Sequence, residues 1–172
     1  TWCVVPDIHI ARACADYPYS ASQDNCDPPN PADQQNPAQG STAWYSQTIS
    51  RGVTTKIPVP YGLRPHRAQS VDPETGAISS LVVVPLADAM SWNEGYGLYG
   101  TGEIDAIASK NDPARPMLIL FGHDGDNAWA GGYSYYTENV PSFAHAAAAK
   151  GYEPTTVAEY LADHPVATDD LV

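Results

Sequence analysis

The sequence predicts an α/β fold, with a partial, barrel-like parallel sheet, helices and long irregular loops. The first observation is a set of three short, mainly apolar runs, at residues 2–6, 78–85 and 117–121. Such runs are typical of strands that are buried on both faces, as in parallel sheets. The second observation is that helical patterns follow the later runs, which is the order of α/β folds. Three strands cannot close a barrel, so we expect a single domain over residues 1–172 that forms an incomplete one.

The N-terminal part begins with the first strand and continues into a long loop. Trp2–Pro6 is the strand, Asp7 and His9 follow at its end, and a helical turn is expected over residues 10–15. Residues 16–67 are rich in Pro, Asn, Asp, Gln and Ser, and repeated prolines prevent helices and interrupt sheet ladders. We therefore expect one irregular loop there, whose aromatic residues either line a sugar groove or hold the loop in place. Those residues are Trp44, Tyr45, Tyr61 and His66.

The central part holds the second strand and an aromatic loop. The strand is expected over Ile78–Pro85. Residues 90–103 contain tryptophan, tyrosines and several glycines, so we expect a loop at the end of this strand. Its side chains of interest are Trp92, a candidate for sugar binding, and the carboxylates Glu94 and Glu103.

The C-terminal part alternates helices with the third strand. We expect helices over residues 101–110, 141–151 and 156–163, and the strand over Met117–Phe121. Pro141 near the start and Gly151 at the end delimit the second helix, and a Thr-x-x-Glu capping box opens the third. This alternation completes the α/β order.

Composition limits the classes of ligand. Twenty acidic residues against eight basic residues give a net charge of −12, which repels nucleic acid and anionic membrane surfaces. The chain has 11 tyrosines and 4 tryptophans, and neutral sugars are commonly held by aromatic faces with carboxylate and amide hydrogen bonds. No apolar run approaches the roughly 20 residues that span a bilayer. We therefore expect a polysaccharide or oligosaccharide as partner, and neither nucleic acid nor a membrane.

The most informative stretch is MLILFGHDGDNAW, residues 117–129, where an apolar strand ends abruptly in polar side chains. In α/β sheets, the carboxyl ends of strands are where sites are built. An ordinary Asp-Gly turn with local hydrogen bonds is the alternative. The concentration of ionisable, amide and aromatic side chains favours a site. These side chains are His123, Asp124, Asp126, Asn127 and Trp129.

Three cysteines, at positions 3, 14 and 26, match no zinc pattern. One disulfide is compatible with an oxidising compartment, so we expect an extracellular or secreted protein. We also expect the 16–39 loop to be ordered either by a Cys14–Cys26 disulfide or by calcium bound to its carboxylates and amides. A solvated loop is the simpler alternative, because the spacing is not that of an EF-hand. Apart from structural calcium, we expect no metal and no cofactor.

Two segments carry a family resemblance. DGDNAW at residues 124–129 and TVAEYLADHP at residues 156–165 resemble, in order and spacing, the part of family 57 glycoside hydrolases, and of the related family 119, that contains the catalytic acid. The runs WCVVPDIHI and SWNEGYGLYG resemble neighbouring elements of those enzymes. The resemblance implies an amylase-type hydrolase with a (β/α)7 barrel, an α-glucan substrate such as starch or maltooligosaccharides, and Asp124 as the general acid.

The second carboxyl group of such a reaction is not identified by the resemblance. In that family the nucleophilic glutamate lies on a strand upstream of the one that residues 2–10 resemble, so we expect the usual nucleophile position to be missing here. A larger catalytic domain that supplies the missing part, or a second copy of the chain, is then the expected protein partner. Local candidates for the second group are Asp126, Glu94, Glu103 and Asp7. Carboxyl groups about 5 Å apart favour retention and about 6.5–9.5 Å apart favour inversion, and both outcomes remain open.

Further roles and two other function classes complete the expectations. Asp126 and Trp129 are expected to raise the pKa of Asp124. One other class is a carbohydrate-binding module or relic fragment that retains affinity without chemistry. The other is a metal-dependent polysaccharide deacetylase that uses His123, Asp124, Asp126 and His9 as ligands, although no His-x-x-x-His spacing supports it. The substrate-binding candidates are His123, Asn127, Trp129, His9, Trp92 and Tyr133.

Overall fold

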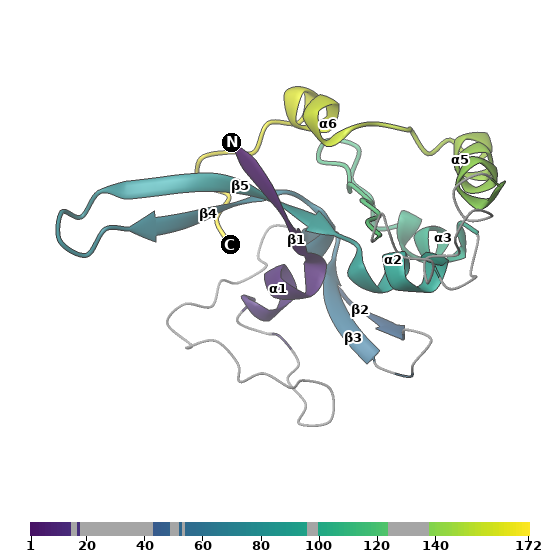
Figure 1. Cartoon of the computed structure of the whole chain (residues 1–172), viewed down its shortest axis with the longest axis horizontal. Coiled ribbons are helices and arrows are strands. Elements are labelled where there is room, and N and C mark those ends of the chain that lie inside the picture. The colour runs from purple at the N-terminus through teal and green to yellow at the C-terminus, as the bar shows by residue number, and fades with distance from the viewer. Residues whose placement is uncertain (15–16, 18–42, 49–51, 53, 96–99, 124–137) are drawn as a thin grey trace.

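The computed structural model describes residues 1–14, 17, 43–48, 52, 54–95, 100–123 and 138–172, which have the expected α/β fold (Figure 1). The strands are β1 (Trp2–Pro6), β2 (Ala43–Thr48), β3 (Thr54–Val59), β4 (His66–Val71) and β5 (Ile78–Leu86). The helices are α1 (Asp7–Arg12), α2 (Asp88–Gly95), α3 (Gly102–Ala108), α5 (Val140–Ala149) and α6 (Val157–Asp163), with a short 3₁₀ helix, η2 (Tyr61–Leu63). None of these described helices is long and apolar enough to cross a membrane.

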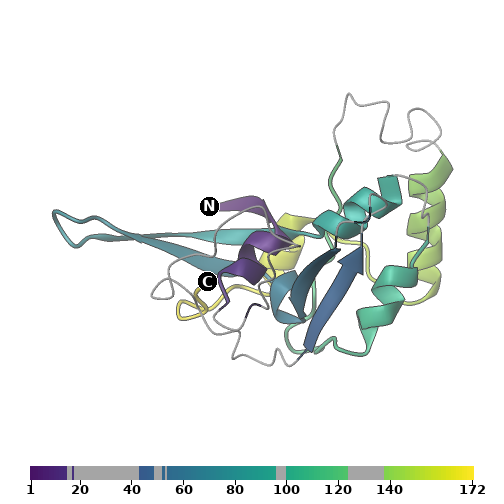
Figure 2. The same ribbon diagram turned by 90° about the horizontal axis from the view of Figure 1, so that it is seen from below.

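The main sheet has the strand order β1-β5-β4. β1 runs parallel to β5, with Trp2 opposite Val82 and Pro6 opposite Leu86, which confirms the predicted parallel pairing. β4 is antiparallel to β5, so the sheet is mixed rather than wholly parallel. Figures 1 and 2 show the β4–β5 ribbon projecting away from the body, with α2, α3 and α5 at the opposite end of the molecule.

The core lies between the main sheet, the β2–β3 pair and the helices. The largest cluster joins Ile57 of β3, Leu63 of η2, Met90 of α2 and Ile107 of α3, which are all at most 2% exposed. A smaller cluster packs Val84 of β5 against side chains of the 117–121 segment and α6. These contacts connect the far end of the chain to the sheet.

The helix ends follow the predicted local rules. In α6 the Thr156 hydroxyl accepts a hydrogen bond from the Glu159 N–H (3.2 Å), and the Glu159 carboxylate accepts one from the Thr156 N–H (3.3 Å). This is the expected capping box. α5 has a proline in its first turn, and Gly151 follows its end with a φ of 84°, a conformation that favours glycine.

A buried ion cluster fixes the C-terminal tail to β4. The His66 ring is completely buried, with Nδ1 2.7 Å from Asp170 Oδ1 and Nε2 2.8 Å from the Tyr61 carbonyl oxygen. Arg115 donates to the other oxygen of Asp170. Burial alone would raise the pKa of Asp170, but His66 and Arg115 together lower the pKa below its ordinary value of 3.8. Tyr61 and His66 therefore have structural roles and do not line a sugar groove.

The prediction of one irregular loop over residues 16–67 was wrong for its second half. Ala43–Thr48 and Thr54–Val59 form an antiparallel pair, with Trp44 opposite Pro58. A proline is tolerated in such a strand because the free edge of a two-stranded sheet needs no hydrogen bond. Residues 15–16 and 18–42 lie outside the described part of the chain. The calcium and Cys14–Cys26 alternatives therefore remain predictions.

The third predicted strand, Met117–Phe121, is not part of either sheet. Its backbone makes isolated hydrogen bonds, from Leu118 N–H to the Leu63 carbonyl and from Ala87 N–H to the Leu120 carbonyl (both 2.9 Å). The segment has an apolar sequence suited to a strand, but β1 and β4 already occupy both edges of its neighbour β5. It therefore passes the end of β5 as an extended connection.

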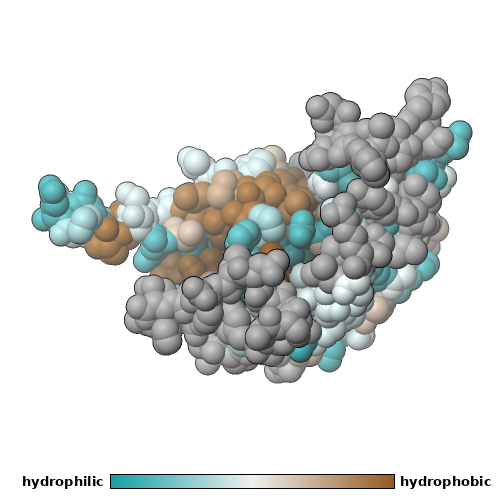
Figure 3. Space-filling view, turned by 60° about the horizontal axis from the view of Figure 1, so that its bottom comes forward, coloured by the Kyte–Doolittle hydropathy of each residue, from teal (hydrophilic) through white to brown (hydrophobic). Residues whose placement is uncertain are grey.

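The first two strands were wrongly predicted to be buried along their whole length. Trp2 and Val4 on β1 are 45% and 42% exposed, and Ile78 at the start of β5 is 66% exposed. Figure 3 shows apolar surface, in brown, between the projecting ribbon and the rest of the molecule. Only the carboxyl-terminal part of β5 is covered by the described residues, as its burial pattern shows.

The Asp170 cluster leads to a stability prediction. Asp170→Asn should lower the free energy of unfolding at pH 7 by about 3 kcal/mol, because it removes the buried carboxylate that pairs with the His66 ring and the Arg115 guanidinium. Urea denaturation measures this difference. The loss should diminish at acidic pH, because the stabilisation from a lowered carboxyl pKa is present above 3.8 and disappears as pH falls through the folded-state value.

Asp169→Asn is the matched control, because Asp169 is an exposed neighbour with the same side chain. It should change the free energy of unfolding by less than about 0.5 kcal/mol. Equal effects of the two substitutions at pH 7 would contradict the importance of the buried cluster.

Candidate functional site

The candidate site begins where β1 and β5 end side by side. Because the strands are parallel and Pro6 lies opposite Leu86, the residues that follow them leave the same edge of the sheet. Asp7 is the first residue of α1 and directly follows β1. Asp88 is the first residue of α2 and is separated from β5 by Ala87 alone. Two acidic residues that are distant in sequence are thereby brought together.

Asp7 is 1% exposed and has an unusual electrostatic environment. Burial, and then the negative charge of Asp88, raise the pKa of Asp7 from 3.8 to about 7. Hydrogen bonds from backbone N–H groups, those of Asp88 and Ile8 among them, partly oppose this rise. Its Oδ2 atom has no hydrogen-bond partner among the described residues. A carboxyl group in this state holds its proton in a large part of the molecules near neutral pH.

His123 is held against one side of α2. Its Nε2 lies 2.8 Å from the Ser91 carbonyl oxygen and 3.5 Å from Glu94 Oε2. The backbone N–H of Gly122 donates to the Ser91 hydroxyl oxygen at 3.1 Å. Residues 91, 94 and 95 share a helix face, and a Cβ at Gly95 would come within 3.0 Å of the His123 ring. α2 therefore fixes the last residues before Asp124. We use the name strand-end cluster for Asp7, Asp88, Ser91, Glu94 and His123.

Another face of α2 holds Glu103. The Asn93 amide group donates to Glu103 Oε1 and to the Thr48 carbonyl oxygen, both at 3.1 Å. Burial raises the pKa of Glu103, and the Asn93 hydrogen bond partly opposes this. Asn93 is 2% exposed, and its side-chain oxygen has no hydrogen-bond partner within the described ranges. Glu103 is thus tied to α2 on a different face from the one that contacts His123.

Some of the predicted site residues lie together in the structure, and others lie apart. The structure brings Glu94 of α2 and His123 together, and it places Asp7 at the start of α1. His9 is exposed on α1, two residues after Asp7. The predicted loop at 90–103 was wrong in its first part, since Glu94 and the partly buried Trp92 lie on α2.

The rest of the predicted site cannot be compared with the structure. Asp124, Asp126, Asn127, Trp129 and Tyr133 lie outside the described residues. Two residues of the cluster were missed by sequence reasoning. Asp88 could have been found by the strand-end rule used for Asp7, because only Ala87 separates it from β5. Ser91 gives no sequence signal, because it acts through a carbonyl and a hydroxyl oxygen.

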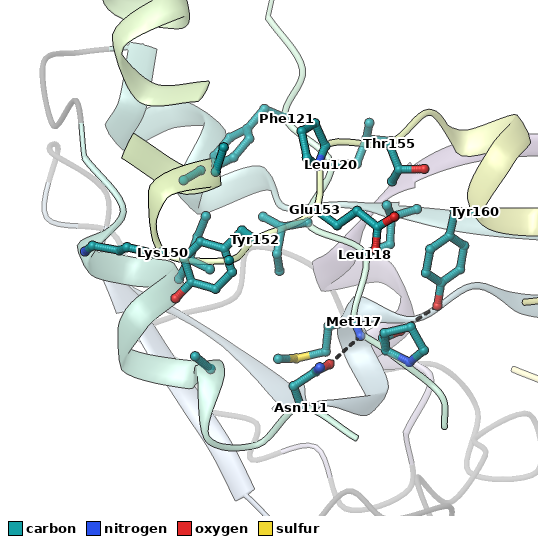
Figure 4. Close-up of a pocket in the computed structure, with 18 of the residues that line it drawn as sticks. Asn111, Met117, Leu118, Leu120, Phe121, Lys150, Tyr152, Glu153, Thr155 and Tyr160 are labelled. Carbon is teal, nitrogen blue, oxygen red and sulfur yellow. Dashed lines mark hydrogen bonds between the residues drawn. The ribbon is translucent and has the colours of Figure 1, made fainter. Parts of the chain in front are cut away.

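A cavity of about 580 Å³ lies on the other side of the 117–121 segment, toward α5 (Figure 4). Its lining is largely apolar, and it includes Phe121 and Phe143. Two polar groups at its margin are already engaged, since Lys150 Nζ and the Tyr152 hydroxyl donate to Asp105. None of the strand-end cluster residues lines this cavity. The described residues also contain no group of three or more His, Cys, Asp or Glu side chains that could hold a metal ion.

The Asp7 environment leads to a prediction on pH and stability. In wild type, the free energy of unfolding should fall as pH rises from about 4 to 7, because the folded chain keeps a proton that the unfolded chain releases. Asp7→Asn is neutral at every pH and should not show this fall. Its advantage should grow toward pH 7, up to a limit of about 4 kcal/mol. A difference between the two proteins that stays constant from pH 4 to 8 would contradict the raised pKa. Urea denaturation at each pH provides the measurement.

Comparison with known proteins gives one informative similarity. No protein-family model matches the chain, and no solved structure matches it. The chain is 33% identical over 181 residues to an alpha-amylase from Niallia circulans, and the match covers 99% of this chain. The chain spans only 13% of the length of that relative. It is therefore similar to one region of an alpha-amylase.

Proposed function

We propose that this chain is part of a glycoside hydrolase of the alpha-amylase type, which acts on α-glucans such as starch or maltooligosaccharides. The observation that carries the proposal is the 33% identity to an alpha-amylase over 99% of the chain. The DGDNAW and TVAEYLADHP segments, which resemble families 57 and 119, support the narrower assignment to that group. In this proposal residues 1–172 form one part of a larger catalytic barrel.

The arrangement of the strand-end cluster supports a site at this place. His123, immediately before the proposed acid Asp124, is fixed by two groups of α2. Enzymes need such positioning because a general acid must stay within hydrogen-bond reach of the leaving oxygen.

Glu94 is the strongest described candidate for the second carboxyl group. Its carboxylate lies 3.5 Å from His123 Nε2. Asp7 and Glu94 are both buried, at 1% and 5% exposed, and Glu94 is preferred because it contacts His123, the residue before Asp124. Glu103 is committed to Asn93 on a different face of α2. Asp126 remains the alternative, and the choice between retention and inversion remains open with it. Contacts with the sugar substrate remain proposals for six residues: His123, Asn127, Trp129, Trp92, Tyr133 and His9. An extracellular location and the absence of a required cofactor also remain proposals.

Hydrolysis of soluble starch is the direct test of the proposal. Release of reducing sugar by the purified chain supports it. Retardation in starch-containing native gels without release would instead identify a carbohydrate-binding module or relic fragment. Absence of both would contradict an α-glucan function. A metal requirement for release of acetate from an acetylated polysaccharide would favour the deacetylase alternative.

Asp124→Asn tests the acid assignment. The substitution removes the proton and keeps the shape, so starch turnover should fall by about 10²- to 10⁴-fold with unchanged circular dichroism. Aryl glycosides with activated leaving groups should lose less, because their departure needs no protonation. Unchanged starch hydrolysis in a folded variant would overturn the assignment.

Asp126→Asn should have a different effect. If Asp126 raises the pKa of Asp124 by like-charge repulsion, its removal should move the basic limb of the pH–rate profile to lower pH. The profile of kcat/KM against pH measures this shift. An unmoved basic limb would show that the charge of Asp126 does not act on the acid.

A further inference from the structure

We propose that Gly95 is a positioning residue, whose missing side chain lets the His123 ring lie against α2 and donate its Nε2 proton to the Ser91 carbonyl. The inference rests on the proposed function for its catalytic consequence, because His123 directly precedes the proposed acid Asp124. Its structural part, the fit of the ring against the end of α2, stands independently of any activity. Gly95 acts on the reaction only through the His123 ring.

The first step is the hydrogen bond between the ring and the helix. His123 Nε2 lies 2.8 Å from the Ser91 carbonyl oxygen. A carbonyl oxygen can only accept a hydrogen bond, so Nε2 must carry the proton that is shared. Glu94 Oε2 lies 3.5 Å from the same nitrogen, and its negative charge also favours a proton there. α2 therefore fixes one protonated nitrogen of the ring as well as the position of the ring.

The second step explains why residue 95 is a glycine. In an α-helix the carbonyl group of residue i points toward residue i+4, so a ring that donates to the Ser91 carbonyl approaches the helix beside residue 95. A Cβ on Gly95 would lie 3.0 Å from His123 Cδ2 and 3.2 Å from Nε2, whereas carbon atoms in optimal contact are about 3.5–4.0 Å apart. Gly95 is not among the described glycines with positive φ. The close ring, and not the backbone conformation, therefore accounts for the glycine.

The third step is that the same helix holds the backbone next to the ring. The Ser91 hydroxyl oxygen accepts the Gly122 N–H at 3.1 Å. A Cβ on Gly122 would lie 2.7 Å from Leu86 Cδ1, so the backbone there also lies against the end of β5. Residue 122 is thus held through its backbone and residue 123 through its ring, and a displaced ring changes the direction in which the chain continues. A misplacement of about 1 Å can lower a catalytic rate about 10²-fold.

The test compares Gly95→Ala with a matched control, Gly102→Ala. Gly102 is the first residue of α3, and a Cβ placed there would meet nothing within 4 Å. Both substitutions add one methyl group to a helix and favour helix formation. The readouts are the ¹⁵N and ¹H signals of the His123 ring, the melting temperature, and kcat and KM on starch. Gly95→Ala is also combined with His123→Ala, because loss of the ring removes the proposed contact.

We expect wild-type His123 Nε2 to give the ¹⁵N signal of a protonated ring nitrogen. Gly95→Ala should shift the ring signals, lower the melting temperature by about 2–4 °C and lower kcat about 5-fold or more with a smaller change in KM. In the His123→Ala background Gly95→Ala should not lower the melting temperature, because the added methyl group then enters the space that the ring has left. Gly102→Ala should leave the ring signals and kcat as in wild type.

Four results would each overturn the proposal. The first is a wild-type ring whose Nε2 carries no proton, and the second is a folded Gly95→Ala variant with the ring signals of wild type. The third is an equal loss of melting temperature with and without the ring. The fourth is an unchanged kcat in an active Gly95→Ala variant whose ring signals have shifted, which would reject the positioning role.

Two further arms keep the test decisive. If Gly95→Ala does not fold, the double variant Gly95→Ala/His123→Ala decides, because it should fold once the ring is removed, and its failure to fold would also overturn the proposal. If wild type hydrolyses no starch, the proposed function fails, whereas the ring signals and melting temperatures still confirm or reject the fit of His123 against Gly95.

Discussion

The parallel pairing of β1 with β5 is the constraint on which the rest of the structure depends. It places Pro6 opposite Leu86, so that two helices begin at the carboxyl ends of two adjacent strands. The first of these helices begins with the buried Asp7, the second begins with Asp88, and the second holds His123. With β4 on the other edge of β5, the 117–121 segment cannot pair with β5 as a strand. The segment passes the strand end instead, which brings His123 to α2.

Local patterns in the sequence were sufficient for much of the fold. The strands near residues 2–6 and 78–86 and the helices α3, α5 and α6 were predicted from apolar runs, a first-turn proline, a terminal glycine and a capping box. The β2–β3 pair was missed because prolines were taken as interruptions, although Pro58 is compatible with a sheet of only two strands. The position of Met117–Phe121 depends on which edges of β5 are occupied. That information is non-local, so the apolar pattern alone could not supply it.

Prediction of the candidate site was likewise divided between residues found from local sequence patterns and residues whose role depends on non-local contacts. Asp7, Glu94 and His123 were recognised because polar side chains at strand ends are informative without knowledge of the fold. Residues 90–95 were assigned to a loop because of the tryptophan, tyrosines and glycines in residues 90–103. They form part of helix α2. Ser91 could not be found from sequence, because its role depends on where its carbonyl and hydroxyl oxygens lie relative to residues 122 and 123.

Burial of Asp7 has a cost that makes its location informative. A buried carboxyl group with one unpartnered oxygen and a nearby like charge destabilises the folded state relative to a neutral residue of the same shape. Backbone N–H groups near the carboxyl group, those of Asp88 and Ile8 among them, offset part of this cost. The same poorly hydrated, negatively charged surroundings raise the pKa of Asp7, and burial raises that of Glu103. Glycoside hydrolysis needs a carboxyl group that retains its proton near neutral pH, and a strand end built in this way provides the electrostatic conditions for one.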